Sequence, residues 1–178
     1  MKERSTEPLS WDMETGQYRY TLEAFDEHVQ SYLKYISESC QRLYKGAAPF
    51  RSYERSIPPE QIKEVRHSLK ELLMPTQEFS WLLHDTDHLP AIYTALRYRL
   101  LAVVNVLEEQ ISRFLDLLHT YQVAGTSSSE GEKWLRSEIY SMFEKLLHYT
   151  ITLSERVKLV SDEAKKQERR LLSLYENY

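Results

Sequence analysis

The sequence predicts an all-α protein, an antiparallel helical bundle of four principal helices with a long C-terminal helical hairpin. Apolar residues recur at alternating steps of three and four in every long segment, which places them on one face of a helix. Stripes of this kind bury themselves against one another, as they do in bundles and coiled coils. Only 4 Gly and 6 Pro interrupt the 178 residues, too few for the turns of a many-stranded sheet.

Three apolar stripes define the longest expected helices. The first comprises Tyr18, Leu22, Phe25, Val29, Tyr32, Ile36, Cys40 and Leu43. The second comprises Tyr93, Leu96, Leu100, Val103, Leu107, Ile111, Phe114, Leu118 and Tyr121. The third comprises Leu135, Ile139, Met142, Leu146, Tyr149, Leu153, Val157 and Val160.

The first part of the chain divides into an arm and a helix. Residues 1–17 are polar and are predicted to form a flexible N-terminal arm, whereas residues 18–178 are predicted to form one helical-bundle domain. The first helix is expected from about Arg19 to Lys45. Gly46 follows it and is the expected residue for a left-handed C-terminal cap.

Prolines punctuate the middle of the chain. Residues 47–59 are predicted to form an irregular connection, and Pro59 suits the first turn of the next helix. Pro75 is predicted to stop that helix, and Thr76 can then cap another. Pro90 predicts either a kink or a new start near residue 87, because proline is tolerated only in the first turn of a helix.

The last helix is expected to be the longest. The small polar residues of Gly125–Gly131 predict a loop, and Ser129 and Glu132 have the spacing of a capping box. The apolar rhythm that follows is unbroken to Val160, and the helix can continue to Tyr175.

Composition narrows the class of function. The four glycines lie too far apart for a glycine-rich phosphate loop, and a net charge of −4 argues against a nucleic-acid partner. Apolar runs are far shorter than the roughly 20 residues of a membrane span. The start of the chain lacks the apolar segment of a secretory signal, and the lone Cys40 lies on an apolar stripe. These features predict a cytoplasmic protein.

The histidines could form a metal site. The candidate ligands are His28, His67, Glu71, His84 and His88. Their order, an isolated His followed by HxxxE and HxxxH, resembles hemerythrin-like oxygen-binding bundles, a resemblance that implies two metal ions held between helices. The fourth element of that pattern, HxxxxD, has no counterpart after either His119 or His148.

Two further resemblances imply other chemistry. The segment 67–70 (HSLK) is similar to the HxLK signature of histidine phosphotransfer domains, although Glu71 stands where those domains have Gly. The spacing of Arg113 and His119 resembles that of HEPN-type RNases, which usually place a polar residue where Phe114 stands. For each set the alternative is a set of surface residues on solvated helix faces.

The end of the chain supplies the favoured function. After the charged segment 161–170, large apolar residues return at Leu171, Leu172, Leu174, Tyr175 and Tyr178. A chain break near Pro90 would leave these residues projecting, whereas a continuous helix there would cover them. We therefore expect a non-catalytic interaction or assembly protein without a cofactor. It would form a homo-oligomer or bind a protein partner through this segment.

Overall fold

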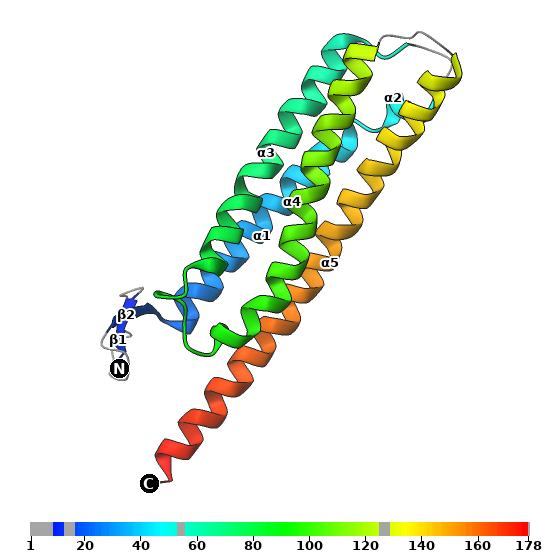
Figure 1. The fold of residues 1–178 in the computed structure, drawn as a ribbon. Helices are drawn as coiled ribbons and strands as arrows, with labels where there is room; N and C mark the ends of the chain where they lie inside the picture. The colour runs from blue at the N-terminus through cyan, green and yellow to red at the C-terminus, as the bar shows by residue number, and fades with distance from the viewer. Residues whose placement is uncertain (1–8, 13–16, 53–55, 125–128, 178) are drawn as a thin grey trace.

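The computed structural model of the chain describes residues 9–12, 17–52, 56–124 and 129–177, and it confirms the all-α class (Figure 1). Two short strands precede the helices. In chain order the elements are β1 (Leu9–Asp12), β2 (Gln17–Tyr20), α1 (Leu22–Lys45), α2 (Ala48–Arg51), α3 (Pro59–His84), α4 (Tyr93–Ala124) and α5 (Ser129–Glu176). Within the described ranges, no helix combines the length and apolar character needed to cross a membrane.

The four long helices lie side by side in alternating directions. Figure 1 shows α1 and α4 running one way while α3 and α5 run the other. Each long helix packs against two others, because α1 and α4 both contact α3 and α5. The short α2 lies against α5 near one end of the bundle.

The core consists of the predicted apolar stripes. Leu107, Phe114 and Leu146 are completely buried, as are most members of the three stripes. Short α2 adds Phe50, whose ring lies 5.6 Å from that of Phe143, and Phe143 in turn lies 4.9 Å from Phe114. The connection between α1 and α3 therefore closes one end of the core with an aromatic side chain.

The prediction that a helix stops at Pro75 is wrong, because α3 runs continuously through it. A proline inside a helix costs about 3 kcal/mol, since it removes one backbone hydrogen bond and crowds the preceding turn. Here Pro75 is buried between the core residues Leu72 and Phe79, so tertiary packing offsets that cost. Thr76 does not cap a new helix; its hydroxyl donates to the Leu72 carbonyl at 2.7 Å.

The start of the chain differs from the expected arm and helix. Strands β1 and β2 form an antiparallel pair, and α1 begins at Leu22 rather than near Arg19. Thr21 is the N-cap, and its hydroxyl accepts a hydrogen bond from the Ala24 amide at 3.2 Å. The Tyr20 amide donates to the His88 carbonyl at 2.8 Å, so a tertiary contact holds this backbone extended.

The chain breaks between α3 and α4. Helix α3 ends at His84 and α4 begins only at Tyr93, so the new helix starts several residues after the predicted position near residue 87. The Tyr93 amide donates to the Pro90 carbonyl at 2.8 Å, which places Pro90 in a turn before the helix. Because of this break, neither helix extends alongside the final turns of α5.

Candidate interaction surface

The C-terminal end of α5 extends past the other long helices (Figure 1). Val160 and Ala164 are still fully buried in the bundle. From residue 169 to residue 177 every side chain is exposed. We call residues 169–177 the α5 projection.

Asp26 marks the level at which α5 leaves the bundle. It stands in the first turns of α1, and its Oδ1 accepts a hydrogen bond of 2.5 Å from the Ser161 hydroxyl. Its other oxygen lies 3.3 Å from Lys165 Nζ. These contacts fix the register of α5 against α1, so the position of the projection follows from a defined anchor.

Four of the five predicted interaction residues are described by the structure and lie in the projection. Their exposed fractions are 47% for Leu171, 56% for Leu172, 60% for Leu174 and 76% for Tyr175. Tyr178, the fifth predicted interaction residue, lies outside the described residues. Full burial of an exposed Leu side chain is favourable by about 1.5–3 kcal/mol, so a partner that covers this surface would be bound more tightly.

The projection continues the stripe that forms the core. Residues on one helix face at heptad spacing are Val157, Val160, Ala164, Gln167, Leu171 and Leu174. The first three are buried, Gln167 is half-buried, and the last two are exposed. The apolar face therefore does not end where its partners end.

Cations flank this apolar surface. Lys165 is paired with Asp26, whereas Lys166, Arg169 and Arg170 are exposed at the base of the projection. These exposed cations make the projection locally basic on a chain whose net charge is −4.

Two of the candidate metal-ligand groups lie apart on the surface. His28 is exposed on α1, and its ring lies edge-on to Tyr20 with centroids 5.4 Å apart. His67 is exposed on α3, where its Nε2 lies 3.4 Å from a carboxylate oxygen of Glu71. His67 and Glu71 thus form a surface contact one helical turn apart, and no third ligand from α1 joins them among the described residues.

The third group is divided by the end of α3. His84 Nδ1 lies 2.8 Å from the Ser80 carbonyl, and His88 Nδ1 lies 2.9 Å from Asp85. The two rings therefore have separate partners. Across the part of the chain that the structure describes, no three His, Cys, Asp or Glu side chains are grouped to hold a metal ion.

The residues behind the other two resemblances are also surface residues. His67 is already engaged by Glu71, the acid that replaces glycine in the phosphotransfer signature. Arg113 and His119 are both exposed on α4. At about 100° per residue they point in directions roughly 120° apart, so they do not share a helix face.

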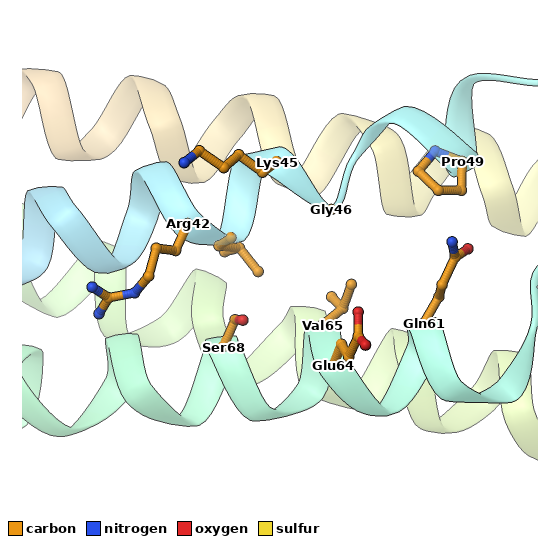
Figure 2. A pocket seen from close by; sticks show the side chains of 9 residues that line it. Arg42, Lys45, Gly46, Pro49, Gln61, Glu64, Val65 and Ser68 are labelled. Atoms are coloured by element: carbon orange, nitrogen blue, oxygen red, sulfur yellow. The ribbon is translucent and has the colours of Figure 1, made fainter.

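Two surface hollows beside α1 and α3 were not anticipated from the sequence. One, of about 270 Å³, lies where α1 ends and α3 begins. Figure 2 shows Gln61 reaching from α3 toward Pro49, while the charged groups of Arg42 and Lys45 point away from it. The cations do not converge there on a common point, so no anion site results.

The second hollow is a groove between the middle of α1 and the middle of α3, with a volume of about 350 Å³. Its lining residues are Tyr35, Ser39, Arg42, Glu71, Met74, Pro75 and Glu78. We call it the α1–α3 groove. Sequence periodicity missed it because a predicted helix end at Pro75 removes one of its walls.

Comparison of the chain with protein-family models, with curated proteins and with solved structures finds no match. The function therefore has to be inferred from surfaces and contacts. Among these, the α5 projection presents four exposed large apolar side chains within five consecutive residues.

Proposed function

We propose that this protein is a non-catalytic helical assembly protein that self-associates, or docks on a protein partner, through the α5 projection. The observation that carries the proposal is the exposure of Leu171, Leu172, Leu174 and Tyr175 on a helix that continues the core stripe. A helix that extends beyond its own bundle and keeps an apolar face is a ready-made element for helix-to-helix or helix-in-groove binding.

Energetics support the same role. Short helical segments without tertiary contacts are marginal in water, because helix formation depends on packing an amphipathic face. Docking would provide that packing and would remove exposed leucine surface from water. Binding would therefore stabilise this helical segment and bury its leucine side chains.

The rest of the surface favours assembly over catalysis. The candidate histidines have separate partners, and the exposed Arg113 and His119 point in different directions. We place the protein in the cytoplasm, a compartment in which a lone thiol stays reduced. Burial raises the pKa of the Cys40 thiol, which keeps it protonated inside the core.

Removal of residues 171–178 tests the proposal. We expect the truncated chain to sediment at a lower mass than the full chain, with an unchanged helical spectrum, because the deleted segment lies outside the bundle. For a partner-binding role, the same truncation must abolish a complex that the full chain forms. A truncated chain that keeps both the mass and the thermal stability of the full chain would remove the hypothesis.

A matched pair of double variants tests whether these particular leucines, rather than exposed apolar side chains in general, support association. In one variant Leu171 and Leu174 become Gln; in the other, Ile151 and Leu159 become Gln. All four side chains are about half exposed or more, but the second pair lies within the bundle region of α5. Only the first variant is expected to lower the sedimenting mass.

A further inference from the structure

The α1–α3 groove has a buried floor and one exposed apolar side chain on each rim. Ser39 and Pro75 are buried, and the small Ser39 side chain leaves room between the helices. Tyr35 on one rim is 58% exposed, and Met74 on the other is 62% exposed. The groove therefore offers the kind of surface that receives an apolar helix face.

The α3 rim of the groove is acidic. Glu71 and Glu78 both line it, and they stand one heptad apart, which is about 10.5 Å along a helix. His67 lies beside Glu71 at 3.4 Å. On the opposite rim Arg42 is the cation that lines the groove, and its guanidinium donates to the Ser39 hydroxyl at 3.1 Å.

The α5 projection has the complementary pattern. Its apolar stripe includes Leu171 and Leu174, and Arg170 lies about 40° from Leu174 around the helix. Arg169 points away from Leu171 and Leu174, on the opposite side of the helix. An apolar stripe with Arg170 at one edge thus matches a groove whose α3 rim carries carboxylates. Arginine–carboxylate pairs are among the stronger charge-assisted hydrogen bonds.

The projection cannot fill the groove of its own chain. Helix α5 is continuous from Ser129 to Glu176, and its C-terminal end lies beyond the end of the bundle where α1 begins (Figure 1). The groove lies farther up α1, because Tyr35 stands about 20 Å along that helix from Leu22. Occupation from the same chain would require α5 to break and fold back.

We propose that the α5 projection of one copy docks into the α1–α3 groove of a second copy. This inference rests on the self-association in the proposed function and names its receiving surface. Leu171 and Leu174 enter the groove between Tyr35 and Met74, and Arg170 pairs with the carboxylates of the α3 rim. The contact joins two different surfaces, so it builds a ring if the rotation between copies closes and a filament if it does not.

Charge reversal on each side tests the proposal. The projection-reversed variant carries Arg170→Glu, and the groove-reversed variant carries Glu71→Lys and Glu78→Lys. All three side chains are exposed, so each variant is expected to keep the helical spectrum and melting temperature of the parent. Like charges then face each other across the contact, and we expect association to weaken roughly tenfold or more in sedimentation velocity.

Mixing the two variants is the decisive measurement. In the mixture, reversed projections meet reversed grooves and unchanged projections meet unchanged grooves, so opposite charges face each other at every contact. We expect the equimolar mixture to recover the mass of the parent, while each variant alone approaches the 21.2 kDa monomer. A mixture that stays monomeric would overturn the proposal.

A control variant carries Glu109→Lys and Asp116→Lys. These exposed acids are also one heptad apart but lie on α4, so the charge change is the same and the surface is different. The control is expected to associate like the parent. Equal losses in the control and the groove-reversed variant would overturn the proposal, because general charge would then explain the effect.

The truncation separates this inference from the proposed function. If removal of residues 171–178 lowers the mass but groove reversal does not, the projection pairs elsewhere, for example with a second projection. The groove assignment then fails while self-association stands. If truncation leaves the mass unchanged, self-association through the projection and the groove assignment both fail.

Discussion

The two ends of one stripe on α5 have opposite environments. Leu146 and Leu153 lie in the bundle and are completely buried, whereas Leu171 and Leu174 lie in the projection and are about half exposed. All four belong to the same helix, α5, and to the same heptad rhythm. The helix itself does not change between them; what changes is the presence of neighbours.

The helices that cover the stripe within the bundle end or begin before the level of the projection. Helix α1 begins at Leu22 because the backbone before it pairs as a strand and bonds to the turn at His88. Helix α3 ends at His84, and α4 begins at Tyr93. A periodic stripe therefore predicts which helix face is apolar, but the ends of other elements decide whether that face is covered.

The sharpest test of the comparison is one leucine truncation in each region. Leu146→Ala is expected to lower the free energy of unfolding by about 2–5 kcal/mol, because a cavity remains in a packed core. Leu174→Ala is expected to change it by less than about 0.5 kcal/mol, as at an exposed position. Urea unfolding followed by circular dichroism measures both. Equal costs would mean that the projection is packed in the monomer.

Two arginines on α5 provide the next test. Arg136 is completely buried; its guanidinium donates to the Ser52 carbonyl at 2.6 Å and lies 3.2 Å from a Glu132 oxygen. Arg136→Met is expected to cost about 1–3 kcal/mol, because the Ser52 carbonyl and the Glu132 carboxylate lose a charged donor. Arg169→Met, in the projection, is expected to be nearly neutral for the monomer. Thermal melts at a concentration too low for association compare the two.

Alkaline pH probes the buried region alone. Burial raises the pKa of the Tyr93 hydroxyl, and the charge of Asp26 raises it further. Above pH 10 the unfolded chain releases this proton while the folded chain keeps it, so stability is full below that pH and falls above it. The slope contributed by Tyr93 is at most about 1.4 kcal/mol per pH unit.

The control for this pH effect is Tyr93→Phe, which removes the titrating hydroxyl. Its unfolding free energy is expected to fall less steeply above pH 10 than that of the parent chain. Identical slopes for the two proteins would contradict the assignment of Tyr93 as the source.

The smallest expected effect lies at the junction of the two regions. Asp26→Asn removes the ion pair with Lys165, a contact with a half-exposed partner that contributes about 0.2–1 kcal/mol. Faster amide hydrogen exchange is expected in residues 165–176, with no change around Leu146. Unchanged exchange in the projection would show that Asp26 does not anchor it.

The candidate surface could be predicted in part from the sequence. Leu171, Leu172, Leu174 and Tyr175 stood out because apolar residues resume after a charged segment. Whether they project or pack depended on the chain break near Pro90, which local sequence left open. The α1–α3 groove could not be predicted from local sequence, because its two walls lie far apart in the chain and meet only through packing.

The sequence by itself determined the all-α class, the apolar face of each long helix, the end of α1 before Gly46 and the start of α3 at Pro59. These features depend on side-chain periodicity and local backbone preference, which act within a few residues. The left-handed cap expected at Gly46 is wrong, because its φ of −78° lies in the right-handed helical region. Tertiary structure alone decided the continuity of α3 through Pro75, the strand at Gln17–Tyr20 and the length of α5 left uncovered. Those outcomes require the burial or backbone pairing that distant segments supply, and such contributions of a few kcal/mol exceed local propensity.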